Sequence, residues 1–310
     1  FPRYQTENRF SYCLVKSEIL DQLAASFPNG YEKIDGCSSY NQSSLEKDPW
    51  RLLPPKLAEV KEDIESECKY IKDLPIEIRA GVATGADDIF IVEKQTAQII
   101  EDELLIPIIR GSNIQKGEIS WDNSFLINPY NQDGTVRNIN NFPKAKKYLS
   151  QHKDRLEDRY CVSNQNKRWY ETHDTIRAER ETRKRIVTPD VTADNKFAIT
   201  ADYVCHNTCY SLYFDGEIEL LLGYFNSDLF KFLLKTSLPE MNSGHWRQMK
   251  RDLKELPVID PGVLNGDSKT TILESTHRRD WDRVSKEFAK IMNISQSNIE
   301  SMREFLEENV

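Results

Sequence analysis

A short loop that contains two glycines is the first part of the sequence that could bind a ligand. Gly81 and Gly85 bracket Thr84, and the apolar residues 89–92 follow shortly after. Glycine accepts positive φ and close backbone approach, so the loop could offer main-chain amides to a phosphate oxygen. The loop lacks the Gly-Lys-Ser/Thr ending with which a P-loop opens its helix. An ordinary hairpin turn explains the same residues equally well, and both interpretations stay open.

Two further patterns resemble metal sites, but each is incomplete. Cys205 and Cys209 flank His206, yet no second ligand pair follows at zinc-finger spacing. Asp190 and Asp194 faintly resemble the carboxylates of a magnesium-dependent nuclease, but the three residues between them leave too little chain for the hairpin that surrounds such an ion. We therefore predict no metal site and no catalytic residue. The six cysteines are expected to be reduced thiols.

Seven short blocks occur in an order that is far more specific than any block alone. They occupy residues 81–92, 106–114, 167–171, 185–190, 206–210, 220–227 and 253–258. In this order they resemble the TaqI-like C-terminal specificity domain, the target recognition domain of N6-adenine DNA methyltransferases and of fused restriction-modification enzymes. The resemblance extends from about residue 74 to residue 261, over half of the chain.

The resemblance implies a module that reads a DNA sequence while a separate catalytic domain flips and methylates adenine. Such a catalytic domain needs an Asn/Asp-Pro-Pro-Tyr/Phe loop and a glycine-rich turn for the methyl donor, and neither is present. Asn128-Pro129-Tyr130 lacks the second proline, so we interpret it as a turn. We expect no cofactor in this chain, and S-adenosylmethionine in a methyltransferase domain of the same polypeptide. Because the chain begins with Phe1, we expect that domain to lie upstream.

The charge of the chain is unfavourable for DNA binding as a whole but favourable in one segment. There are 42 basic and 50 acidic residues, which gives a net charge of −8. Residues 144–185 carry thirteen Lys or Arg and seven Asp or Glu, a local excess of six positive charges, with four aromatic residues among them. Local charge matters more than net charge within a Debye length of about 8–10 Å. We expect this segment to follow the DNA backbone, although its charges could instead solvate an amphipathic helix.

Candidate DNA-binding residues are polar side chains on loops near the blocks that carry the resemblance. Arg and Lys suit guanine and phosphate, whereas Asn and Gln suit adenine. Arg247 and Lys250 are the first candidates, and for Arg110 a salt bridge is the plain alternative. The complete predicted set is Thr84, Gly85, Arg110, Ser112, Asn113, Lys146, Lys147, Arg168, Trp169, Tyr170, His245, Trp246, Arg247 and Lys250.

Two other classes of function remain possible at this point. One is a fragment of a magnesium-dependent restriction nuclease, which would use the pair Asp190 and Asp194. The other is a non-catalytic protein-protein scaffold that docks through its helices and shows no salt-dependent affinity for DNA. The leading interpretation predicts double-stranded DNA as the partner and no contact with a membrane. No apolar run approaches the ~20 residues of a membrane span, and no signal peptide opens the chain, so we expect a soluble, cytoplasmic protein.

The hydrophobic pattern predicts an α+β fold with mixed, mostly antiparallel twisted sheets and packed helices. It is expected to have a helical N-terminal connector (1–73), a recognition domain (74–261) and a C-terminal helical tail (262–310). In the connector, a strand is predicted at 11–15, a helix from about 17, and an amphipathic helix over 57–71. Other predicted strands are 89–92, 106–109, 124–127, 185–188, 197–200, 210–214 and 253–258, and other predicted helices are 144–160, 217–236, 281–292 and 295–308.

Overall fold

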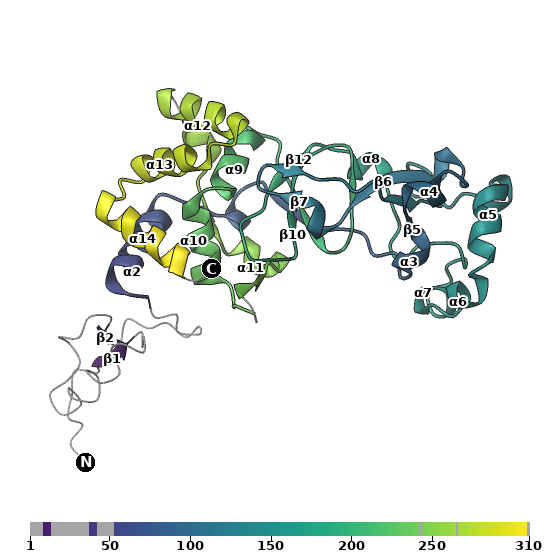
Figure 1. Cartoon of the computed structure of the whole chain (residues 1–310), viewed down its shortest axis with the longest axis horizontal. Helices are drawn as coiled ribbons and strands as arrows, with labels where there is room; N and C mark the ends of the chain where they lie inside the picture. The colour runs from purple at the N-terminus through teal and green to yellow at the C-terminus, as the bar shows by residue number, and fades with distance from the viewer. Residues whose placement is uncertain (1–8, 14–36, 42–52, 242–243, 265, 309–310) are drawn as a thin grey trace, which may run out of the picture. The chain divides into compact units, whose positions relative to one another are not determined.

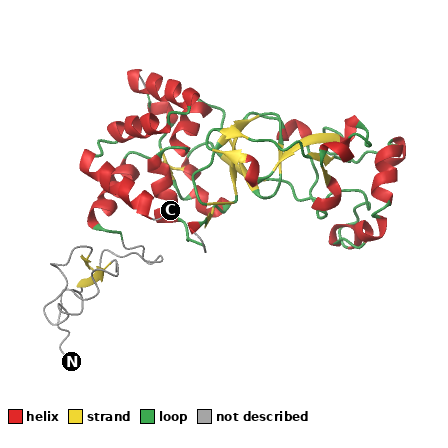
Figure 2. Ribbon diagram, viewed as in Figure 1, coloured by secondary structure: helices red, strands yellow, loops and turns green. Residues whose placement is uncertain are grey.

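The computed structural model describes residues 9–13, 37–41, 53–241, 244–264 and 266–308. Helices and short strands are mixed along the chain, and all but one of the pairings between the described strands are antiparallel (Figures 1 and 2). The predicted α+β class with mostly antiparallel sheets is therefore confirmed. By their contacts the described residues form two units, one up to residue 67 together with 292–308 and the other from 68 to 291. The predicted three-part division of the chain stays a prediction.

The first unit contains a hairpin and a pair of helices. The hairpin joins β1 (Arg9–Cys13) to β2 (Cys37–Asn41) in antiparallel register, and it includes most of the strand predicted at 11–15. Helix α2 (Pro55–Ser66) buries Leu57, Val60 and Ile64 and packs against α14 (Gln296–Glu308). The helix predicted from about residue 17 lies outside the described residues.

The second unit is built on two four-stranded sheets. The first has the order β12-β10-β14-β4, in which every neighbouring pair is antiparallel. The second has the order β13-β6-β9-β5, in which β13 runs parallel to β6. Their strands are β4 (Glu77–Ala80), β5 (Ile91–Val92), β6 (Leu105–Ile109), β9 (Phe125–Ile127), β10 (Arg185–Pro189), β12 (Ala198–Thr200), β13 (Val204–Cys205) and β14 (Cys209–Tyr213).

Short helices and loops cover the second sheet around one apolar core. Ile108, Leu126 and Ile127 from the sheet pack with Phe90 and Leu149 from the helices, and all five are buried. The helices here are α3 (Asp87–Phe90), α4 (Lys94–Ala97), α5 (Pro143–Ser150), α6 (Lys153–Glu157), α7 (Tyr160–Ser163) and α8 (Ala178–Glu181). The 3-10 turns are η4 (Asp102–Leu104), η5 (Gly111–Asn113) and η6 (Ile139–Asn141).

Helices also pack behind the first sheet. The predicted helix over 217–236 is divided in two, because the Ser227 hydroxyl accepts the Phe230 amide at 3.3 Å and caps a second helix. Phe197, Phe225 and Phe230 stack across this junction with ring centres 4.8–5.6 Å apart. The helices are α9 (Ile218–Phe225), α10 (Asp228–Ser237), α11 (Lys250–Lys254), α12 (Gly266–Arg278) and α13 (Trp281–Ile291).

Three two-stranded ladders complete the second unit. The strand predicted at 253–258 is restricted to its last two residues, since α11 occupies the first part of that range. The ladders are β3 (Lys69–Tyr70) with β16 (Pro257–Val258), β7 (Ile114–Gln115) with β8 (Glu118–Ile119), and β11 (Val191–Thr192) with β15 (Trp246–Arg247). The turns η3 (Ile71–Asp73) and η8 (Pro261–Val263) flank the first ladder. Among the described helices, none is both long and apolar enough to cross a bilayer.

Candidate nucleic-acid interface

Four strands of the two larger sheets end at one place. β4 and β10 both pair antiparallel with β14, so they run in the same direction and end beside Cys209, where β14 begins. β13 runs parallel to β6, and Val82 after β4 forms a parallel bridge with His206 after β13. The segments that follow these strands therefore meet. We call residues 81–86, 110–113, 190 and 206–208 the strand-end loops.

Main-chain hydrogen bonds hold the strand-end loops together. The Gly81 amide donates to the Cys209 carbonyl at 2.9 Å, and the Val82 amide donates to the Cys205 carbonyl at 2.8 Å. The backbones approach so closely that a Cβ atom on Gly81 would lie 2.1 Å from the His206 carbonyl oxygen. Glycine is needed here because no side chain fits between the two loops.

Of the two interpretations that the sequence leaves open for the loop at Gly81, the one in which its amides bind a phosphate does not hold for four of its residues. The Gly81 and Val82 amides donate to the main chain, as described above. The Ala83 amide donates to the Asp174 carboxylate at 2.8 Å, and the Ala86 amide donates to the Thr84 hydroxyl at 3.0 Å. These donors are already satisfied inside the protein. The loop is therefore a brace between segments of the fold.

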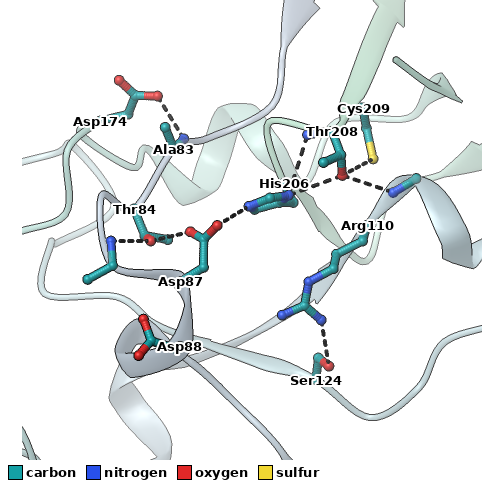
Figure 3. A network of polar contacts seen from close by, with 12 residues as sticks. Ala83, Thr84, Asp87, Asp88, Arg110, Ser124, Asp174, His206, Thr208 and Cys209 are labelled. Carbon is teal, nitrogen blue, oxygen red and sulfur yellow. Dashed lines mark hydrogen bonds and ion pairs between the residues drawn. The ribbon is translucent and has the colours of Figure 1, made fainter. Parts of the chain in front are cut away.

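A chain of polar groups joins the strand-end loops (Figure 3). His206 Nε2 lies 2.9 Å from the Asp87 carboxylate, and Nδ1 lies 3.1 Å from the Thr208 hydroxyl. The Thr208 hydroxyl accepts the Gly111 amide at 3.1 Å, and the Thr84 hydroxyl donates to the second Asp87 oxygen. Since the Thr208 amide also donates to Nδ1 at 3.4 Å, Nδ1 is the acceptor and Nε2 carries the proton. The network fixes the position of one loop against another.

Arg110 stands at the end of β6 with a fixed backbone and a loosely held guanidinium. The Arg110 backbone amide donates to Oδ1 of Asn113 at 2.8 Å, and Nδ2 of the same Asn113 side chain donates to the Ser120 carbonyl at 3.0 Å. The guanidinium reaches the Ser124 hydroxyl only at 3.4 Å and the Asp122 carboxylate at 3.9 Å. With 35% of its side chain exposed, Arg110 is available to a ligand, and so is the exposed Ser112.

Part of the predicted basic and aromatic set gathers around one surface hollow of about 640 Å³, which we call the Trp169 hollow. Lys146, Arg168 and Trp169 line it together with Lys153, whose ammonium lies 6.0 Å from the centre of the Trp169 ring. Lys147 lies on α5, as Lys146 does, but it lines a different hollow together with Lys144 and Ile99. The helix predicted over 144–160 is broken into α5 and α6, so the basic residues do not form one continuous stripe.

Several cations of the basic segment support the fold instead of facing solvent. Arg159 donates to the carbonyls of Leu156, Thr84, Trp169 and Glu171 at 2.7–3.1 Å. The Lys167 ammonium donates to two carbonyls at 2.7 and 2.9 Å. Arg185 is fully buried and donates to the Ser211 hydroxyl and to main-chain carbonyls. Fewer of these positive charges are therefore free to contact DNA than the local excess of six suggests.

The segment around Arg247 reaches the same edge as the strand-end loops. Arg247 lies on β15, and its guanidinium pairs with Asp190 at 3.2 Å. The Asp190 amide in turn donates to the Thr208 carbonyl at 2.8 Å, which links Arg247 to the loop at 206–208. More than half of the Arg247 side chain is exposed, and Lys250 at the start of α11 is exposed as well. His245 is half-buried.

The carboxylates considered for a nuclease site serve different cations. Asp190 pairs with Arg247, whereas Asp194 pairs with Lys231 at 3.0 Å. Burial raises the pKa of Asp194, but the charges of Lys116 and Lys231 outweigh that effect and leave its pKa below the usual value. Across the described ranges, no group of three or more His, Cys, Asp or Glu side chains is placed to hold a metal ion.

Four predicted DNA-binding side chains are buried, so they are not exposed to a ligand at the surface. They form internal hydrogen bonds or pack in the core, so each supports a neighbouring exposed residue. The four are Thr84, Asn113, Tyr170 and Trp246. The other predicted residues, Gly85 included, lie at the surface or half-buried. Asn207 is also exposed.

The chain was compared with known proteins. Residues 106–258 match the model of the TaqI-like C-terminal specificity domain. The Type II methyltransferase M.BstVI of Geobacillus stearothermophilus is 28% identical over 264 residues, which cover 84% of this chain and 47% of that protein. The Type II methyltransferase M.PaeR7I of Pseudomonas aeruginosa is 22% identical over 250 residues, which cover 80% of this chain and 43% of that protein. The chain thus spans about half the length of the curated relatives it matches.

Solved structures show the same fold. The type IIG restriction endonuclease BpuSI aligns with a TM-score of 0.58 at 15% identity, over 96% of this chain and 39% of that one. The type IIL restriction-modification enzyme MmeI in complex with DNA aligns with a TM-score of 0.51 at 13% identity, over 78% of this chain and 36% of that one. These two likenesses concern the fold alone. The family match covers residues 106–258, just under half of the chain, and over that range the chain is similar to the TaqI-like C-terminal specificity domain family.

Proposed function

We propose that the chain reads a DNA sequence for an adenine-N6 methyltransferase of a restriction-modification system. The family match over residues 106–258 carries this proposal, and the M.BstVI and M.PaeR7I relatives give the enzyme class. A catalytic domain of the same polypeptide binds S-adenosylmethionine and methylates the adenine. The present chain supplies the contacts that choose the site, and double-stranded DNA is its partner.

The exposed polar residues beside the strand-end loops suit this function. Arg110 and Arg247 belong to segments that are linked through the loop at 206–208, as the Gly111–Thr208 and Asp190–Thr208 hydrogen bonds show. Because β6 and the β11–β15 ladder hold these segments by their main chains, the side chains can project to a duplex without disturbing the fold. Phosphate contacts position a protein on DNA, and contacts to base edges specify the sequence.

The experiment is a salt titration of duplex binding by the chain and three variants. Lys146 and Lys147 are exposed lysines on α5, and each is assigned to a phosphate. Replacing either with Ala should weaken binding to every duplex and reduce the slope of log K against log salt by about one unit. Lys56→Ala is the matched control, because Lys56 is an exposed lysine on α2 in the other unit.

The outcomes separate the classes of function. A salt-dependent affinity whose slope falls for Lys146→Ala and Lys147→Ala, but not for Lys56→Ala, supports the DNA reader. Absence of any salt-dependent binding would favour a protein scaffold. Magnesium-dependent cleavage that is lost in Asp190→Ala would favour a nuclease.

A further inference from the structure

A second polar hollow, which was not predicted from the sequence, lies beside the strand-end loops. We call it the Arg110 groove; its volume is about 480 Å³. Residues from three segments line it: the stretch after β5, the end of β6 and the turn before β9. The lining residues that matter here are Glu93, Gln95, Gln98, Arg110, Asp122 and Asn123.

The side chains in the Arg110 groove have unused hydrogen-bonding capacity. In the described part of the chain, Gln95, Gln98 and Asn123 have no side-chain hydrogen bond, and Arg110 has only the two long contacts noted above. An unpaired amide at a surface costs little in water, but it leaves both a donor and an acceptor ready for a ligand.

The backbone of the groove is nevertheless well defined. Gln95 lies within α4 and Gln98 is its C-terminal cap, three residues on, so the two lie on one side of that helix. Asn123 has a φ of 63°, a conformation that Asn accepts more readily than most residues, and the Ser124 amide donates to the Asp122 carboxylate at 3.1 Å. The side chains therefore project from fixed positions.

The charges in the two hollows differ and point to different ligands. The Trp169 hollow is lined by Lys146, Lys153 and Arg168 and by no carboxylate, which suits phosphate. In the Arg110 groove the carboxylates Glu93 and Asp122 balance the cations Lys94 and Arg110, so the groove attracts phosphate less than the Trp169 hollow does. A mixture of guanidinium, amide and carboxylate groups matches the donors and acceptors on base edges.

We infer that the Arg110 groove reads base edges in the major groove of the recognised DNA, whereas the Trp169 hollow contacts the phosphate backbone. Arg110 is placed to donate to the O6 and N7 acceptors of a guanine, and Gln95 or Asn123 to exchange hydrogen bonds with an adenine. Gln95, Gln98 and Asn123 are thus specificity-determining residues. This inference rests on the proposed function.

The experiment selects bound sequences from a random duplex library with the full chain and with four variants. Gln95→Ala and Asn123→Ala should each reduce discrimination at one base-pair position by roughly tenfold and leave the other positions unchanged. Arg110→Lys keeps the charge but loses the planar fork, so it should relax the preference at one position while the salt slope stays as in the wild type. Gln132→Ala is the control, because Gln132 is an exposed glutamine outside both hollows.

The result distinguishes failure of this inference from failure of the proposed function. If the wild type selects no sequence motif, the proposed function is wrong and the inference falls with it. If the wild type selects a motif and all three groove variants select the same motif with unchanged discrimination, only the inference is wrong. A uniform loss of affinity for every sequence, with a smaller salt slope, would show that the groove binds phosphate.

Discussion

Replacing Gly81 with Ala should destabilise the protein far more than its position in a loop would suggest. The added Cβ would lie 2.1 Å from the His206 carbonyl oxygen and 2.5 Å from that of Cys205. An ordinary contact begins at 3.4 Å, so the two backbones must separate by about 1.3 Å. That movement breaks the hydrogen bonds from the Val82 amide at 2.8 Å and from the Asn207 amide at 3.0 Å.

The expected cost follows from these two effects. Each broken main-chain hydrogen bond costs about 1 kcal/mol. Overpacking of a rigid contact costs a further ~1–3 kcal/mol. Together they lower the free energy of unfolding by about 3–5 kcal/mol, a large part of the ~5–15 kcal/mol that is usual for a domain. Equilibrium unfolding in urea, followed by tryptophan fluorescence, measures this change through the shift of the midpoint.

Gly244→Ala is the control for this measurement. Gly244 has a positive φ of 70°, and no heavy atom lies within 4 Å of a Cβ built there. Its substitution should therefore cost only the ~1–2 kcal/mol of a left-handed alanine. If Gly81→Ala costs no more than Gly244→Ala, the close approach of the loops is not what requires glycine at residue 81.

Two further predictions concern the charged pairs. Asp194→Asn leaves Lys116 and Lys231 without their shared carboxylate and should lower the free energy of unfolding by about 1–3 kcal/mol at neutral pH. The folded pKa of Asp194 lies below its ordinary value of 3.8, so its stabilising effect is complete above pH 3.8 and disappears as the pH falls through the folded pKa. Urea unfolding of the wild type and of Asp194→Asn from pH 6 to pH 2 should show the difference between their free energies of unfolding becoming smaller. A difference that stays constant over this range would contradict the role assigned to Asp194. Arg247→Ala should relax the preference at one base pair in a competition assay with single-base-pair variants of the recognised site, whereas an equal loss on every duplex would assign Arg247 to phosphate.

The sequence predicted the sheets well where strands are long, apolar and flanked by turn residues. The strands predicted at 106–109, 185–188 and 210–214 correspond to β6, β10 and β14. The prediction at 89–92 was half wrong, because Ile89 and Phe90 belong to α3 and only the last two residues form β5. All four of these residues are buried, and in so short an apolar run the periodicity cannot distinguish a helix from a strand.

Most of the predicted helices that fall within the described residues were located correctly, but some of them were predicted to be too long. The helix predicted over 57–71 ends at Ser66, and the tail contains α12 in addition to the two predicted helices. The Ser295 hydroxyl accepts the Asn298 amide at 3.2 Å and so caps the last helix. The breaks within 144–160 and 217–236 depend on packing and capping that the apolar stripe does not record.

The candidate site was predictable only in part. The glycine loops and Arg110 were recognisable because each of their blocks contains an apolar run beside its loop. The Arg110 groove was not, because Gln95 lies in a one-turn helix and Asn123 in a turn about thirty residues away. The antiparallel pairing of β5 with β9 brings these segments together, and such a long-range pairing leaves no local pattern.

The gathering of four strand ends at one edge has a consequence for how such a protein can diversify. Gly81 and Gly111 maintain the close contacts through their main chains, and the registers of the sheets are set by buried residues behind them. Exposed side chains at that edge can therefore be exchanged by mutation while the scaffold is inherited intact. Proteins that share this architecture can therefore acquire a new target while they keep the same fold.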